Sequence, residues 1–192
     1  MPESLQALAD IIEWSKEHES PLGYFAALYT KVGLRIEEAI ENDKFQHPDM
    51  LRHLDVVFFN RYLEALHLWH HGDSPTLPWK VAIDATENAK LIVLQHLLLA
   101  MNAHIALDLG VATAEAIPKQ KLHGFKTDFD TMNQLLASIM HDVEKDMALI
   151  FKLLKPINFL FRKEEDMILN FSMRLVRKQA WDTCLKLSAL DG

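Results

Sequence analysis

The sequence predicts an all-α fold, a single-domain helical bundle of about six to eight helices spanning residues 1–192. Apolar residues recur at three- and four-residue spacing along most of the chain, which is the period of an amphipathic helix. The 192 residues include only six glycines, and strands are nowhere obvious. A chain of this length buries roughly 70% of its unfolded surface and needs no disulfides to fold.

The first half of the chain predicts three helices. Residues 4–18 have helical spacing and end at "ESPLG", where proline prevents smooth continuation. A second helix is predicted over residues 24–42, and a third over about Pro48 to His71, with Pro48 in its first turn and Gly72 as its C-cap. "GDSPTLPWK" is the clearest loop because it has two prolines and turn-forming residues.

The second half predicts a helical block over residues 79–108, with a break near "DATEN". "GVATAEAIPKQKLHG" indicates a short helix and a loop. Thr127 or Asp128 is then expected to N-cap a long helix that reaches Leu154. Asp128 and Asp130 both suit a helix start, where the helix dipole favours acids. A last helix, or a pair of helices, fills residues 162–190.

Composition narrows the functional class. The net charge of −7 disfavours nucleic acid as a partner. The single cysteine, Cys184, cannot form an intramolecular disulfide, so a cytoplasmic setting is expected. The first residues lack the pattern of a signal peptide, and the longest apolar run predicts no membrane span. Nucleophile elbows, phosphate-binding glycine loops and paired Cys-x-x-Cys motifs are also missing from the sequence. The oligomeric state stays open.

The segment "LIVLQHLLLAMNAHIALDLG", residues 91–110, is the strongest candidate for a site. It is the most apolar predicted helix, yet it carries several side chains that form hydrogen bonds. Since each buried polar group without a partner costs about 1–3 kcal/mol, such a set predicts a polar network or a functional pocket. The five side chains are Gln95, His96, Asn102, His104 and Asp108.

His96, His104 and Asp108 are candidate metal ligands as well as candidate catalytic residues. Two histidines and a carboxylate are usual ligands of a divalent metal such as zinc or iron. A divalent metal ion is therefore the candidate cofactor. His104 and Asp108 lie one helical turn apart and can converge on one ion, whereas His96 lies about 12 Å of helical rise from His104 and requires a bend. In the alternative, a histidine acts as a general base and Asn102 or Asp108 orients it.

Side chains from two other predicted helices are expected to contribute. Asp55 is a further catalytic candidate, because its aromatic neighbours raise a carboxyl pKa unless a cation such as Arg61 lies nearby. Arg61 and Arg174 are candidates for binding an anionic part of a ligand, and Tyr62 is the third ligand-binding candidate.

Arg177 precedes Trp181 by four residues in the last predicted helix. This spacing allows the guanidinium to stack on the indole, which is a common structural pair and also a usable anion pocket.

Several segments together resemble the domain-of-unknown-function family 5995. They are "YFAALYTKVG", "LDVVFFNRYLEAL", "VLQHLLLAMNAHIALDLG" and "FSMRLVRKQAW", with "DFDTMNQLL" between the last two, and they extend over about residues 24–187. The resemblance implies a helical fold and supplies no activity. Ala100 stands where the family tends to have glycine before Met-Asn-Ala-His. The Asn-Ala-His segment is also similar to helical zinc enzymes of the phospholipase C and P1 nuclease type, by analogy alone.

Two functional hypotheses remain. In the first, the protein is a small-molecule enzyme, metal-dependent or acid–base and hydrolase-like, with its pocket on the 91–108 helix. In the second, it is a non-catalytic helical binding or interaction protein whose polar groups form a structural network. The sequence does not decide whether the protein is an enzyme.

Overall fold

The computed structural model describes the backbone of residues 2–153 and 163–190, and the side chains of residues 4–139 and 175–190. Within these ranges all regular elements are helical, which confirms the predicted all-α fold. Counting α5, η2 and α6 as one continuous helix gives seven helices in the described part. The elements are α1 (Pro2–Glu17), α2 (Leu22–Glu41), α3 (Pro48–His70), α4 (Leu77–Asp84), η1 (Ala85–Glu87), α5 (Val93–Asn102), η2 (Ala103–Asp108), α6 (Leu109–Ala116), η3 (Lys119–Lys121), α7 (Leu122–Leu153) and α8 (Lys163–Leu190).

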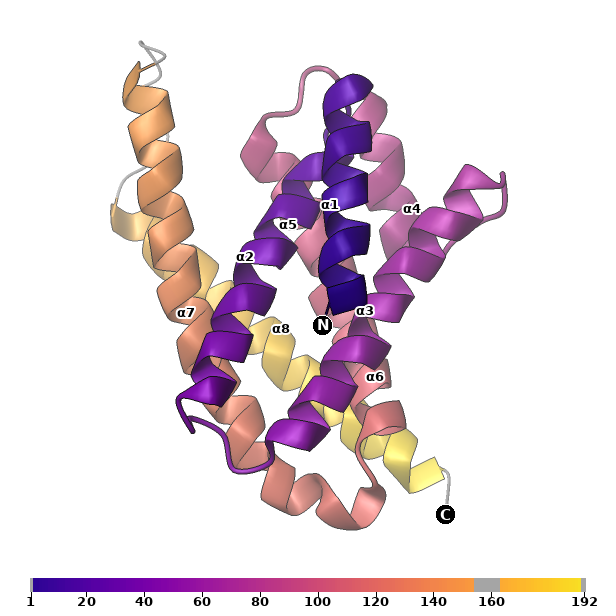
Figure 1. The fold of residues 1–192 in the computed structure, drawn as a ribbon, viewed down its shortest axis with the longest axis vertical. Helices are drawn as coiled ribbons and strands as arrows, with labels where there is room; N and C mark the ends of the chain where they lie inside the picture. The colour runs from indigo at the N-terminus through magenta and orange to yellow at the C-terminus, as the bar shows by residue number, and fades with distance from the viewer. Residues whose placement is uncertain (1, 154–162, 191–192) are drawn as a thin grey trace.

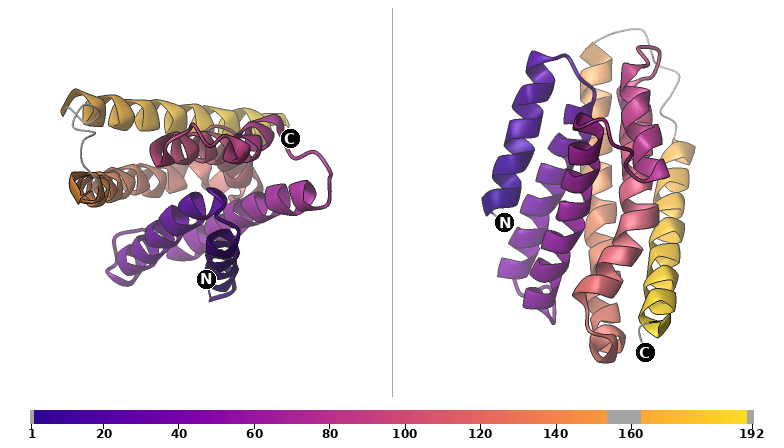
Figure 2. Two further views of the ribbon diagram at one scale, coloured as in Figure 1. Left: turned by 90° about the horizontal axis from the view of Figure 1, so that it is seen from above. Right: turned by 90° about the vertical axis from the view of Figure 1, so that its right-hand side faces the viewer.

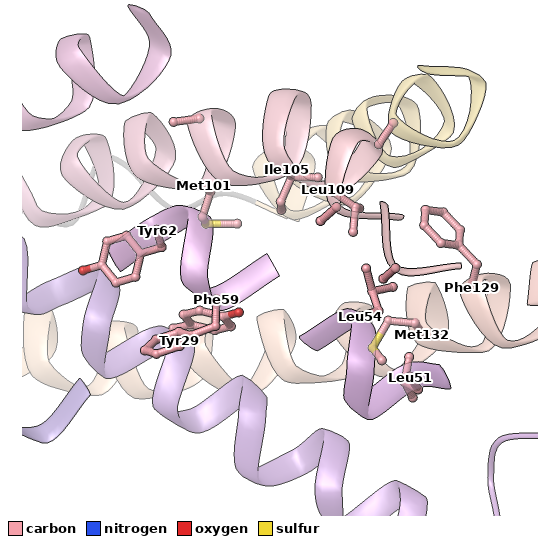
Figure 3. Packing of buried hydrophobic residues seen from close by; sticks show 14 of the residues in the cluster. Tyr29, Leu51, Leu54, Phe59, Tyr62, Met101, Ile105, Leu109, Phe129 and Met132 are labelled. Carbon is pink, nitrogen blue, oxygen red and sulfur yellow. The ribbon is translucent and has the colours of Figure 1, made fainter. Parts of the chain in front are cut away.

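The helices pack around one cluster of buried hydrophobic side chains, and each α-helical segment from α1 to α8 contributes to it. Figure 3 shows part of this cluster. α1 packs against α2, and α6 packs against both α3 and α8 (Figures 1 and 2). α5 contacts α2 and α4, while α7 contacts α2 and α8. The continuous helix from α5 to α6 therefore lies among most of the other helices and positions the candidate residues at the centre of the fold.

Most of the predicted helix ends are confirmed. Pro48 opens α3, and Gly72 follows its last turn with a φ of +80°, a left-handed conformation that glycine adopts readily. The break near "DATEN" is the short 3₁₀ helix η1 and an irregular stretch before α5. Gln95 accepts a hydrogen bond from the Ile92 backbone N–H at 3.0 Å. This residue thus has a local role at the start of α5, as a capping side chain.

The predicted start of α7 is wrong. The helix begins at Leu122 instead of after Thr127 or Asp128, because Leu122 and Phe125 are buried and extend its apolar face toward the N-terminus. Asp128 therefore lies inside the helix and is 1% exposed. Its carboxylate accepts hydrogen bonds from the backbone N–H groups of Gln46 and His47, at 2.7 and 2.8 Å, and contacts His47 Nδ1 at 2.9 Å. Asp128 ties the loop before α3 to α7.

The helix that carries the polar residues runs without interruption from Val93 to Ala116. η2 is a π-helical segment, in which hydrogen bonds join residues five apart and each turn holds an extra residue. This segment changes the rotational phase of the helix between His96 and Asp108. By length and composition the helix is able to cross a membrane, but 61% of its most apolar window is buried in the fold, as in a core helix.

The helix continues past Asp108, and Gly110 in its next turn allows α8 to approach closely. A Cβ atom at Gly110 would lie 2.7 Å from the carbonyl oxygen of Ala180 and 3.0 Å from Cβ of Thr183. A larger residue at this position would push α6 and α8 apart. This contact fixes η2, one turn upstream, relative to α8.

Candidate functional site

An apolar cavity of about 100 Å³ lies beside η2. Its wall is built from α2, α3, α5, η2, α6, α7 and α8, and most of its lining side chains are aliphatic or aromatic. Several of them appear in Figure 3, including Tyr29, Met101 and Met132. Four side chains with polar groups interrupt this lining, namely Tyr29, Asp55, His104 and Arg177.

His104 lies in a cage of aromatic rings. Its side chain is 4% exposed, and its ring stacks on Phe58 with 3.5 Å between centroids and an interplanar angle of 11°. Phe25 and Tyr29 approach at 5.4 and 4.9 Å between centroids. Neither ring nitrogen has a hydrogen-bond partner. Burial lowers the pKa of His104 below its usual value, so the imidazole is neutral near pH 7.

Asp108, by contrast, is satisfied on both carboxylate oxygens. Oδ1 accepts a hydrogen bond from Nε of Arg61 at 3.0 Å, and Oδ2 accepts one from the indole N–H of Trp79 at 2.6 Å. Nδ1 of His104 is 3.8 Å from Oδ2, beyond hydrogen-bonding distance. Burial alone would raise the pKa of Asp108, but the neighbouring His104 and Trp79 and the charge of Arg61 hold it below its ordinary value. The carboxylate is therefore ionised and firmly anchored.

Asp55 is the second acid–base group at the cavity. Burial, reinforced by the charge of Glu37, raises the pKa of Asp55 to about 6. This raised pKa agrees with the sequence-based expectation for a carboxyl group among aromatic side chains. The pKa of Tyr29 is also raised, by burial and by the charge of Asp55, and its hydroxyl is buried without a hydrogen-bond partner. The cavity therefore has Asp55, Tyr29 and His104 on its wall, each with a perturbed pKa.

His96 and Tyr62 belong to a different part of the core. Both line a second, smaller cavity of about 20 Å³ next to Trp79. His96 is 7% exposed, and its ring is 6.4 Å from that of Tyr24. Tyr62 is 1% exposed, and its hydroxyl has no hydrogen-bond partner. His96 and His104 therefore line different cavities, and Asp108 lines neither of them.

Of the remaining predicted residues, Asn102 and Arg61 do not line the main cavity. Asn102 is exposed, so it does not orient His104 from within the core. Arg61 is bound to Asp108, and its side chain is 24% exposed. The side chain of Arg174 lies outside the described residues.

The donor atoms near Asp108 fit a metal ion poorly. His104 and Asp108 are neighbours, but both Asp108 oxygens are already occupied by the Arg61 and Trp79 donors. Over the side chains that the structure describes, three or more His, Cys, Asp or Glu residues gather nowhere in a way that could hold a metal.

Sequence reasoning missed two residues of this region, Trp79 and Tyr29, and gave a third, Arg177, the wrong ring partner. The sequence predicted only a helix start at Trp79, whereas its indole N–H donates a hydrogen bond to Asp108, 29 residues later in the chain. Tyr29 belongs to the apolar face of α2 and gave no separate signal. Arg177 was expected to stack on Trp181, but its guanidinium lies 4.7 Å from the centre of the Phe129 ring. Arg177 shares one helical face with the buried Ala180 and Trp181, and a charged residue on an apolar face was the signal available.

Comparison with known proteins gives a family and no activity. A model for a family of unknown function, DUF5995, matches residues 1–192. No curated protein and no solved structure matches the chain. Because the family model covers the whole sequence, the resemblance found in its segments extends beyond residues 24–187 to both ends. The chain belongs to the DUF5995 family.

Proposed function

We propose that this protein binds a small, largely apolar molecule in the cavity beside η2, and that His104 serves there as a hydrogen-bonding and acid–base group. The observation that carries this proposal is the pair of His104 ring nitrogens, both buried and both without a hydrogen-bond partner. A buried polar atom left unpaired costs about 1–3 kcal/mol. A ligand that bonds to the imidazole offsets this cost, and the cavity wall includes His104.

The neutral imidazole of His104 is able to accept a proton. Because burial keeps the imidazole neutral, one of its two nitrogens has a free lone pair near pH 7. The anchored carboxylate of Asp108 lies on the Nδ1 side at 3.8 Å and favours the tautomer with its proton there. Nε2 is then the acceptor toward a ligand. General-base chemistry on a ligand with an acidic proton is the form of catalysis that this arrangement supports.

The π-helical segment supports the same assignment. Single π turns inside α-helices occur frequently at functional sites, and η2 contains both His104 and Asp108. A structural role, the second hypothesis, is favoured for the group Asp108, Arg61 and Trp79, because its hydrogen bonds satisfy both carboxylate oxygens. We therefore assign fold stabilisation to Asp108 and ligand contact to His104.

Methyl NMR on protein labelled at the methionine methyl groups tests this proposal. Met101 and Met132 line the cavity, whereas Met50 is outside it and serves as the internal control. The matched probes are cyclopentanol and cyclopentane, which share a small apolar ring and differ by one hydroxyl group. Saturable shifts at Met101 and Met132, with a larger affinity for the alcohol and a changed His104 ¹⁵N signal, are the expected result. Shifts no larger at the cavity methionines than at Met50, for both probes, would refute the proposal.

A further inference from the structure

Arg177 is a buried cation whose guanidinium has no counter-ion in the described part of the structure. Its residue is 5% exposed, and it lies on the wall of the same cavity as His104. Nε donates a hydrogen bond to the side-chain oxygen of Asn133, which is neutral. Among the residues whose side chains are described, no Asp or Glu forms an ion pair with Arg177. Asp130 on α7, whose charge acts on Arg177, is itself bound to Lys126.

Arg61, the other arginine near the site, has a guanidinium whose charge is balanced by a carboxylate. It is 24% exposed and pairs with the buried carboxylate of Asp108 at 3.0 Å. Arg177 is more deeply buried and is neutralised by no such group among the described residues. Removing a cation from water costs several kcal/mol unless an anion accompanies it. Burial accordingly lowers the pKa of Arg177 to about 10, which marks it as a poorly solvated charge.

The Arg177 donors that have no partner among the described residues suit a planar anion. A guanidinium has five N–H donors in a fixed fork, and Arg177 uses Nε for Asn133. The other donors match the two oxygens of a carboxylate. Phe129, 4.7 Å from the guanidinium carbon, fixes the plane of the fork by a cation–π contact.

Arg177 and His104 line the cavity from different helices. Arg177 contacts α7 through Phe129 and Asn133, whereas the ring contacts of His104 include Phe58 on α3 and Tyr29 on α2. In Figure 3, Phe129 and Met132 lie on one side of the view and Tyr29 lies on the other. Aliphatic side chains such as Met101 and Ile105 line the space as well.

We propose that the ligand is a small apolar monocarboxylate, with its carboxylate bound by Arg177 and its hydrocarbon body in the cavity directed toward His104. This inference rests on the proposed function and adds the chemical class of the ligand. One cationic side chain neutralises a single negative charge, so a carboxylate fits better than a doubly charged phosphate. The apolar lining and the volume of about 100 Å³ limit the body to a few carbon atoms.

The test compares cyclopentanecarboxylate with cyclopentanecarboxamide, which has the same shape and no charge. Both are titrated into the full chain at pH 7 and followed at the Met101 and Met132 methyl groups. We expect the carboxylate to bind at least tenfold more tightly than the amide. R177M is expected to remove this preference, and K178M, at the exposed neighbouring position on α8, is expected to retain it.

The outcomes separate this inference from the proposed function. If wild-type protein binds cyclopentanol and the amide but discriminates against the carboxylate, the ligand class is wrong and the binding function stands. If none of the probes binds, both proposals fail. A carboxylate preference that survives in R177M would also overturn the inference, because another group would then hold the anion. Should R177M not fold, R177Q and the wild-type comparison of acid with amide decide the question.

Discussion

Asp128 and His104 are both polar side chains buried in core helices, and their surroundings differ completely. Asp128 is 1% exposed and is held by two backbone N–H donors and the His47 ring, all from the loop before α3. His104 is 4% exposed, and neither of its ring nitrogens has a hydrogen-bond partner. Its neighbours are aromatic rings and an apolar cavity.

This difference separates buried polar groups that stabilise the fold from those that are available for a ligand. The chain supplies every partner that Asp128 needs, so its removal is expected to weaken the fold. The chain leaves His104 unpaired, so its removal is expected to spare the fold and weaken binding. Asp108 resembles Asp128 in this respect, although it adjoins His104 on the same helix.

The largest effect is expected for Asp108→Ala. The substitution leaves the buried Trp79 N–H without an acceptor and the Arg61 guanidinium without its carboxylate. Breaking a buried pair in this way costs about 3–5 kcal/mol of unfolding free energy, measured by urea denaturation. Asp84→Ala is the control, since its exposed ion pair with Lys80 is expected to contribute less than about 1 kcal/mol. A loss below about 1 kcal/mol for Asp108→Ala would contradict the anchoring role.

Asp128→Ala is expected to reduce the unfolding free energy by about 2–3 kcal/mol, because the N–H groups of Gln46 and His47 lose their acceptor. Asp130→Ala provides a matched control two residues away on α7, where the exposed carboxylate binds Lys126. Equal denaturation midpoints for the two variants would show that Asp128 does not hold the loop.

Asp55→Asn is expected to increase stability near neutral pH by about 1–2 kcal/mol. The pKa of Asp55 is about 6 in the folded protein against an ordinary value of 3.8, so the folded state binds the proton more tightly. Wild-type stability therefore falls as pH rises from about 4 to 6, and the variant lacks this fall. Unfolding curves for the two proteins should coincide near pH 4 and separate above pH 6. The reverse pattern, or no separation, would contradict a buried Asp55 carboxyl.

Sequence patterns predicted the helices well because each one repeats a local period. Pro48 and Gly72 mark the ends of α3 in the sequence as well as in the structure. The start of α7 was misplaced because Asp128 looks like a helix-capping acid, and its true partners lie 81 and 82 residues away. Local periodicity contains no information about such distant contacts.

The candidate site was predicted in part. His104, Asp108 and Asp55 were identified from polar residues on apolar helices, and the structure places two of them, His104 and Asp55, at one cavity. The separation of His96 from His104 agrees with the two helical turns between them, whereas the π-helical segment was not predictable because no residue type marks it. The cavity itself depends on how side chains from several helices pack, so no single segment encodes it.

The most direct measurement combines stability and binding in His104→Phe. A phenyl ring conserves the stacking on Phe58 and removes both unpaired nitrogens. It also removes a pH effect: burial lowers the pKa of His104, so wild-type protein loses stability as pH falls below about 6.5, where the unfolded chain gains the proton. We predict an unfolding free energy at pH 7 that is unchanged or up to about 1 kcal/mol higher, with cyclopentanol binding weakened at least tenfold. A loss of about 2 kcal/mol or more of unfolding free energy, with unchanged cyclopentanol binding, would show that His104 stabilises the fold and contacts no ligand.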